Sequence, residues 1–310
     1  MRATSARGSR VDQTAIDIEP QTNEVRARQG GGEILRPLLR ETLLRVLDCA
    51  STLETEGEKG VHQLRVALRR ARTMASIVRR GGNDGLIDEL AVALRWAGQE
   101  LGPARDLDTL LQGALAPDIA DAPAGFAALR VRAQEKRAQA FDKARASIAS
   151  PAWREQIERV AARLGDAPAD KGARGVIAEA ARKELRRRWR KLRKRAKHAA
   201  DGGVETLHAL RIQAKKQRFA IELFADIFPD ARRKRDRMLA ALKRLLDRLG
   251  ALNDIATHRS LLVDLAAEGG DAGGYAAGFL AGQESACAEA LISKAEAALS
   301  KLIEVKPFWK

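Results

Sequence analysis

The chain has 310 residues, which is enough for one large or two ordinary domains with a substantial hydrophobic core. Its 56 Lys and Arg against 41 Asp and Glu give a formal charge of +15, so an anionic partner is the first expectation. Only 4% of the residues are aromatic, which argues against a protein that stacks the bases of single-stranded nucleic acid.

Targeting signals and cysteine usage indicate where such a chain works. No apolar run approaches the roughly 18 residues needed to span a membrane. The segment 1–10 lacks the apolar core of a signal peptide. Cys49 and Cys287 form no C-x-x-C pair, and we expect both as reduced thiols on buried helix faces. These features favour a cytoplasmic location without a membrane partner.

The first part of the chain predicts a tail followed by a helical half. Residues 1–32 have no sustained apolar period and end in three glycines, which is typical of a flexible tail. Apolar residues at helical spacing and glycine stops then predict helices over 33–55, 60–80, 86–101, from 105 onward, and 126–147. The break between the first two lies at Gly57 and Gly60, and residues 33–150 make the first half.

The second part repeats this plan. A linking segment over 151–174 leads to a second half, 175–305, and a short C-terminal end, 306–310. Its helices are predicted over 175–200, over a second basic segment from about 204, and over 230–249, 254–267 and 274–303. The glycine-rich segment 269–274 is the clearest hinge in the body of the chain.

Two helices carry matching rows of cations, and these are the main candidate site. At about 100° per residue, the row in the first half forms a strip about 80° wide beside an apolar face. The two rows are His62, Arg65, Arg69 and Arg72, and His208, Arg211, Lys215 and Arg218. Two further sets of candidates are Arg36 and Arg40, one turn apart, and Arg182, Arg186, Arg190 and Arg193, which share one face of the most basic helix.

The rows recur with a second motif, which suggests an internal duplication. Leu101-Gly102-Pro103-Ala104-Arg105-Asp106 and Leu249-Gly250-Ala251-Leu252-Asn253-Asp254 follow the two basic helices at the same spacing to within two residues. The sequence therefore predicts an all-α fold: an internally duplicated helical bundle. We expect two four-helix-bundle-like halves, related by a pseudo-two-fold axis, around a basic channel.

The doubled H-x-L-R and L-G-x-x-[RN]-D patterns resemble the CHAD family, the conserved histidine α-helical domains, over about residues 33–305. The resemblance implies an all-α protein that binds inorganic polyphosphate in a basic cavity and is associated with polyphosphate granules. It implies the two histidine-containing rows as the site. Lys215 stands where the first row has Arg69, which replaces a bidentate phosphate clamp by a point charge.

Several candidate residues keep more than one interpretation. His62 and His208 could contact phosphate, hold structural hydrogen bonds or bind a metal, and the metal is disfavoured because neither has a carboxylate or histidine three or four residues later. Asp106 and Asp254 fit helix capping or pairing with a strip arginine better than catalysis. We interpret His198 and His258 as incidental and Trp189 as a core residue.

The function predicted from the sequence is non-enzymatic binding of polyphosphate, without catalytic residues, metal or cofactor. No P-loop, H-E-x-x-H or G-x-S-x-G motif is present, and acids do not cluster as they do around catalytic Mg²⁺. Two alternatives stay open: a basic helical protein that binds nucleic acid, and a metal-assisted enzyme that processes polyphosphate or phosphate esters. The oligomeric state is left open.

Overall fold

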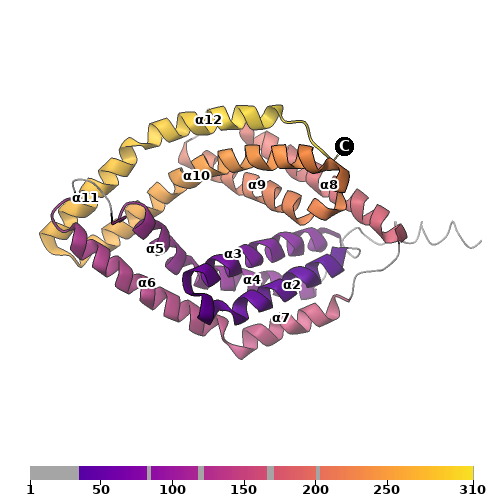
Figure 1. The fold of residues 1–310 in the computed structure, drawn as a ribbon, viewed down its shortest axis with the longest axis horizontal. Coiled ribbons are helices and arrows are strands. Elements are labelled where there is room, and N and C mark those ends of the chain that lie inside the picture. Colours follow the sequence, from indigo (N-terminus) through magenta and orange to yellow (C-terminus); the bar gives the residue numbers. More distant parts are fainter. Residues whose placement is uncertain (1–34, 82–84, 118–121, 166–170, 200–202, 310) are drawn as a thin grey trace, which may run out of the picture.

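The structure is a computed structural model, and it describes residues 35–81, 85–117, 122–165, 171–199 and 203–309. Every regular element in these ranges is a helix, which confirms the predicted all-α fold (Figure 1). The tail predicted over residues 1–32 lies outside the described residues. The predicted internal duplication stays a prediction.

The helical elements follow one another along the chain from α2 to α12. In chain order they are α2 (Arg36–Ser51), α3 (Leu53–Val78), η2 (Arg79–Gly81), α4 (Gly85–Glu100), α5 (Gly102–Gln112), α6 (Phe126–Ile148), α7 (Pro151–Arg163), α8 (Lys171–Ala196), α9 (Val204–Leu223), η3 (Ala225–Ile227), η4 (Pro229–Ala231), α10 (Arg232–Ala267), α11 (Gly270–Ala286) and α12 (Ala288–Glu304).

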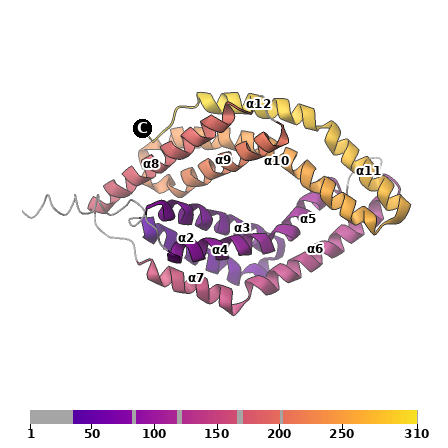
Figure 2. The ribbon, with the colours of Figure 1, turned by 180° about the vertical axis from the view of Figure 1, so that it is seen from behind.

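Two groups of helices lie side by side. In one group α2 contacts α3 and α7, and α4 contacts α3 and α7; in the other α9 contacts α8 and α10, and α10 contacts α12. Figures 1 and 2 show the groups from opposite sides, with α5, α6 and α11 at the end where they join. The two basic helices, α3 and α9, contact each other between the groups. The predicted linking segment therefore includes α7, which packs on α2 and α4.

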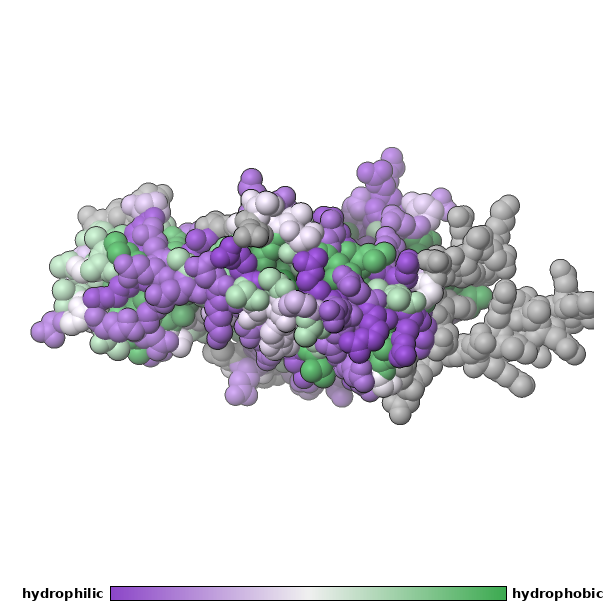
Figure 3. All heavy atoms as spheres, turned by 90° about the horizontal axis from the view of Figure 1, so that it is seen from below, coloured by the Kyte–Doolittle hydropathy of each residue, from purple (hydrophilic) through white to green (hydrophobic). Residues whose placement is uncertain are grey.

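The surface is mainly polar. Seen from below, hydrophilic side chains cover most of the visible face, and the hydrophobic areas between them are small (Figure 3). Among the residues that the structure describes, each helix is too short or too polar to pass through a lipid bilayer.

Two hydrophobic cores hold the helices. The larger core runs through both groups and includes the predicted apolar face of α3, where Leu64, Leu68 and Ala71 are buried. The smaller core joins α5, α6, α11 and the second half of α10, with Leu110, Leu129 and Leu280 buried. Residues of this second core come from before and after residue 150. Each group is thus fixed to the other by shared apolar packing.

The two Leu-Gly motifs differ in structure, so the predicted helix stop at Gly250 is wrong. α4 ends before Gly102, and α5 begins there with Pro103 in its first turn, a position that proline tolerates. Gly250 instead lies inside the continuous helix α10. Its neighbour Leu249 is in the larger core, and Leu262 of the same helix is in the smaller one. Packing on both sides outweighs the roughly 1 kcal/mol that glycine costs in a helix.

Three further expectations are tested by the glycines and cysteines. A break does occur at Gly57, whose φ of 52° bends α3. The glycine-rich linker predicted over residues 269–274 is shorter than expected, because α11 begins at Gly270 and only a short turn separates it from α10. Its role as a hinge stays a prediction. Cys49 is buried as predicted, but Cys287 is exposed because the helix predicted over 274–303 divides there into α11 and α12.

The C-terminal residues are anchored by aromatic packing. Trp309 is 2% exposed, and its ring lies 6.3 Å from that of Trp189 in an edge-to-face arrangement. Phe308 packs in the same way against Phe228, with ring centres 5.8 Å apart. Trp189 is therefore a core residue, as predicted.

Replacing this anchor should destabilise the protein strongly. We expect Trp309→Ala to lower the free energy of unfolding by about 3–5 kcal/mol, the usual cost of deleting a buried aromatic ring. Tyr275→Ala is the matched control, because Tyr275 is 63% exposed and its loss should change the value by less than about 0.5 kcal/mol. Urea unfolding followed by far-UV circular dichroism measures both, and similar values for the two variants would contradict the anchoring role.

Candidate anion-binding site

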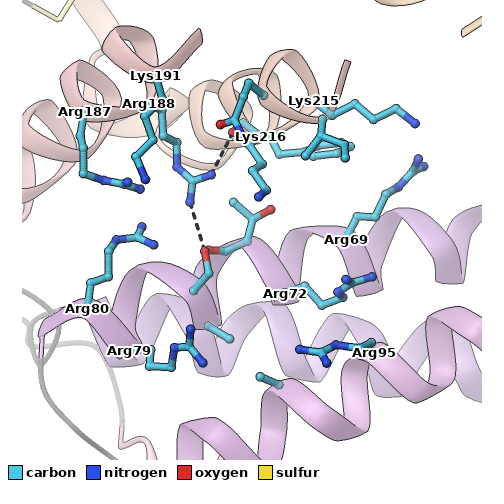
Figure 4. A pocket seen from close by; sticks show the side chains of 17 residues that line it. Arg69, Arg72, Arg79, Arg80, Arg95, Arg187, Arg188, Lys191, Lys215 and Lys216 are labelled. Carbon is cyan, nitrogen blue, oxygen red and sulfur yellow. Dashed lines mark hydrogen bonds between the residues drawn. The ribbon is translucent and has the colours of Figure 1, made fainter. Parts of the chain in front are cut away.

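A pocket of about 590 Å³ lies between α3, α4, α8 and α9. Ten cations line it, and we call it the cationic pocket: Arg69, Arg72, Arg79, Arg80, Arg95, Arg187, Arg188, Lys191, Lys215 and Lys216 (Figure 4). None of the described residues that line it is acidic. The remaining lining is neutral and includes Ser76, Gln213 and Phe219.

Local sequence explains why these side chains reach the pocket. Helical residues that follow a buried position by one lie at the border of the apolar face. Arg69 and Arg72 directly follow the buried Leu68 and Ala71, so both stand beside the core face of α3. Lys215 follows the buried Ala214 of α9 in the same way. Because α3 and α9 contact each other, their bordering cations meet in one pocket.

Three of the predicted site residues line the pocket, namely Arg69, Arg72 and Lys215. The others lie outside its lining: His62, Arg65, His208, Arg211 and Arg218 on α3 and α9, Arg36 and Arg40 on α2, and Arg182, Arg186, Arg190 and Arg193 on α8. Arg65, Arg211 and Arg218 nevertheless lie near it, since their charges lower the pKa of Arg69.

The pocket is lined by a different face of α8 from the one that carries the predicted strip. Arg187, Arg188 and Lys191 line it instead. The rotation of α8 is set by its buried residues, which include Leu185 and Trp189. Of the predicted strip, Arg182 stacks on Phe228 with 5.5 Å between the guanidinium carbon and the ring centre, and the side chains of Arg186, Arg190 and Arg193 are exposed.

Sequence reasoning missed seven of the ten lining cations. The three on α8 were assigned to other faces of that helix. The other four belong to neither repeated row: Arg79 and Arg80 of η2, Arg95 of α4 and Lys216 of α9. A usable signal was present for one of them, since Arg79 follows Arg72 by seven residues, two helical turns further on the same side, directly after the end of α3.

Arg65 and Arg211 hold matching anchored positions. Arg65 Nη1 donates a hydrogen bond of 2.8 Å to the carbonyl oxygen of Leu101. Arg211 Nη1 donates one of 2.9 Å to Oδ1 of Asn253. Both acceptors belong to the Leu-Gly motifs, so each motif fixes the arginine of its own half.

The acidic residues of the motifs do not cap helices. Leu101 occupies the cap position of α5, and Asp254 lies inside α10, so the predicted capping is wrong. The alternative of pairing with strip arginines fits better. Burial raises the pKa of Asp106, the charge of Arg65 opposes this, and Asp254 adds to it. Asp254 in turn counters the lowering of the Arg211 pKa by burial.

None of the four histidines, all in the described part of the chain, belongs to the lining of the pocket. Burial lowers the pKa of His62 from its ordinary value, and Arg105, Arg69 and Arg65 lower it further, so this imidazole is neutral at pH 7. His258, interpreted as incidental, is instead buried, with Nδ1 2.8 Å from Glu284 Oε1. This contact joins α10 to α11. Among the described residues, no group of three or more histidine, cysteine or acidic side chains is placed to hold a metal ion.

Burial and crowding of like charges both lower the pKa values of two facing cations, Arg69 and Lys215 (Figure 4). Burial lowers the pKa of Arg69 to about 10, with further lowering by Arg65 and Arg218. Burial likewise lowers the pKa of Lys215 to about 8, helped by Arg211 and Arg69. Without a ligand, the charged forms of these two cations are therefore destabilised by desolvation and by mutual repulsion.

Comparison with known proteins gives a consistent set of matches. The model of the CHAD domain family matches residues 38–263. The crystal structure of the CHAD domain from the plant Ricinus communis is similar, with a TM-score of 0.68, 26% sequence identity, and coverage of 87% of this chain and 92% of that one. PptA from Streptomyces chartreusis has a TM-score of 0.61 and 16% identity, covering 87% and 99%, which is a likeness of fold. None of the curated proteins matches the chain.

Removing the Lys215 charge should stabilise the empty protein. The pKa of this lysine is lower in the folded chain than its ordinary value of 10.5, so the cost of its charge is fully present below pH 8. We expect Lys215→Met to raise the free energy of unfolding at pH 7 by an amount on the order of 1 kcal/mol. The gain should shrink as the pH rises from about 8 to 10.5.

Urea unfolding at pH 7 and pH 10 measures this effect. Lys194→Met is the control, since Lys194 is exposed on α8 outside the pocket lining. Its stability should stay within about 0.5 kcal/mol of the native protein. A loss of stability in Lys215→Met at pH 7 would contradict the crowding argument.

Proposed function

Because the chain belongs to the CHAD domain family, we propose that it binds inorganic polyphosphate in the cationic pocket and performs no reaction on it. The observation that carries the proposal is the lining itself, with ten cations and no acid among its described residues. Polyphosphate offers a receptor only closely spaced negative charge. A stiff array of arginines and lysines on helices is suited to such a ligand, since arginine can hold two phosphate oxygens at once.

The fold supports a longer binding path than the pocket alone. Arg65, Arg211 and Arg218 lie close enough to act on the charge of Arg69. We propose that these side chains extend the cationic pocket into a channel between α3 and α9. Burial and mutual repulsion lower the pKa values of Arg69 and Lys215. Phosphate bound along the channel would relieve the repulsion, and this relief adds to the affinity.

Nucleic acid fits the pocket less well. The one aromatic residue of its described lining, Phe219, is covered by Arg69, whose guanidinium carbon lies 5.3 Å from the ring centre. Base stacking on an open aromatic face, which supplies much of the affinity of single-strand binders, is thus lacking here. A pocket of about 590 Å³ among four helices admits a narrow phosphate chain and not a duplex.

The cellular setting belongs to the same proposal. We expect the protein in the cytoplasm, as its cysteine usage favours, and at polyphosphate granules, as the family resemblance implies. Binding without catalysis implies that polyphosphate recovered from the complex keeps its chain-length distribution, with and without Mg²⁺. A shortened distribution would favour the enzyme alternative.

Two cations of the pocket should contribute more to polyphosphate affinity than two cations outside it. We expect Arg72→Ala with Lys191→Ala to weaken polyphosphate binding by about a hundredfold or more, because each missing hydrogen bond to a charged group costs roughly 1.5–3 kcal/mol. Arg186→Ala with Arg193→Ala is the matched control. It removes two exposed cations outside the pocket lining, and the affinity should fall only a few-fold.

Titration calorimetry with long-chain polyphosphate over a salt series measures both pairs. The slope of log affinity against log salt should fall by about one for each phosphate group that is no longer neutralised, by analogy with nucleic acids. Equal effects of the two pairs would place the ligand outside the pocket. Competition by single-stranded DNA as effective as that by polyphosphate at physiological salt would favour the nucleic-acid alternative.

Polyphosphate binding should weaken above pH 8. In the empty protein Lys215 loses its proton as the pH passes about 8, whereas bound phosphate favours the charged form. The affinity should therefore fall between pH 7 and pH 9.5, with proton uptake on binding. Lys215→Arg keeps its charge throughout and should remove most of this dependence. Calorimetry in buffers of different ionisation enthalpy tests it, and an unchanged pH profile in the variant would refute the role of Lys215.

A further inference from the structure

A single buried carboxylate lies directly behind one end of the cationic pocket. Glu184 of α8 is 7% exposed and forms ion pairs with three arginines of the lining. Its Oε1 accepts hydrogen bonds of 2.5 Å from Arg80 Nη2, 2.8 Å from Arg187 Nη2 and 2.5 Å from Arg188 Nε. Its Oε2 accepts one of 2.8 Å from Arg187 Nε.

These contacts connect both groups of helices. Arg80 belongs to η2, at the end of α3, whereas Glu184 lies on α8. Arg188 completes the connection: its Nη2 donates to Oγ of Ser76 at 3.2 Å, and its Nη1 lies 3.5 Å from the carbonyl oxygen of Lys216 on α9. Arg188 is 4% exposed, and each of its guanidinium nitrogens has a partner.

Arg80 and Arg187 keep part of their hydrogen-bonding capacity. In the described part of the chain, Glu184 uses neither Nη1 group of this pair. Both side chains remain partly exposed, at 38% and 27%. Each can therefore bind an anion in the pocket while Glu184 holds the other side of its guanidinium.

A carboxylate at this place needs an explanation, because its charge repels the ligand. It stays ionised: burial raises the pKa of Glu184, but the hydrogen bond from Arg187 and the charges of Arg188 and Arg80 outweigh burial and lower it. Without it, three guanidinium groups would face one another across the pocket end with no counter-charge. Repulsion would then spread them among many rotamers, and the ligand would have to order them on binding.

We propose that Glu184 is a positioning residue that increases the affinity of the pocket for polyphosphate, although its own charge opposes binding. It orders Arg80 and Arg187 across the two helix groups before the ligand arrives. This inference rests on the proposed function. It assigns a favourable effect on polyphosphate binding to a residue whose charge alone would weaken that binding.

Charge and positioning predict opposite effects for Glu184→Gln. If only charge mattered, removing an acid beside the pocket would tighten polyphosphate binding and steepen its salt dependence. If Glu184 positions the arginines, we expect affinity to fall about tenfold to a hundredfold, because one or two charge-assisted hydrogen bonds are no longer ready. The slope of log affinity against log salt should fall by about one to two.

Asp236→Asn is the matched control. Asp236 also pairs with an arginine, since Arg235 Nε lies 3.2 Å from its Oδ1, but both residues are outside the pocket lining and the proposed channel. This change removes the same charge, so we expect binding to stay equal or become slightly tighter. The melting temperature of each variant without ligand shows whether the variant is folded under the conditions of the binding measurement.

A second variant covers the case in which Glu184→Gln does not fold. Glu184→Asp keeps the charge but draws it back by one methylene, so charge alone predicts unchanged affinity and positioning predicts weaker binding. Titration calorimetry with long-chain polyphosphate over a salt series measures each variant. The inference is overturned if a folded Glu184 variant binds polyphosphate as tightly as the native protein does, or more tightly. Absence of binding by the native protein would instead refute the proposed function.

Discussion

Mutual repulsion among confined cations is the constraint on which this structure depends. Ten cations line one pocket, and burial and neighbouring charge lower the pKa of Lys215 there to about 8. Such an array would push two loosely joined helix groups apart. The two hydrophobic cores resist this, because the larger runs through both groups and the smaller joins them at one end. The packing of leucines and alanines thus holds the cations close together against their mutual repulsion.

Hydrogen bonds and ion pairs fix the arginines that the hydrophobic cores bring together. Arg65 and Arg211 are each fixed by an acceptor in the motif that follows their helix, Leu101 and Asn253. The two arginines lie at matching places in the two halves of the sequence, whereas Leu101 is the first residue of its motif and Asn253 the fifth of its own. Glu184 gathers three arginines at the end of the pocket. Cations that would otherwise be mobile side chains are in this way held by defined partners.

Local patterns in the sequence predicted much of the fold, and non-local packing decided the rest. The apolar period of α3 predicted its buried face, and Trp189 was correctly predicted as a core residue. Arg69, Arg72 and Lys215 were found because they border such a face. The rotation of α8 depends on what its apolar residues contact far away in the chain, which no local period reveals. For the same reason Gly250 could not be known to lie inside a helix.

The contrast between the two cysteines makes the molecule convenient for spectroscopy. Cys49 is buried, and burial raises the pKa of its thiol, so its reactive thiolate is scarce at neutral pH. Cys287 is exposed where α11 meets α12, outside the cationic pocket. A maleimide dye will therefore attach at one place without any engineered residue. Its fluorescence can report on the native chain while every charge of the pocket stays as it is.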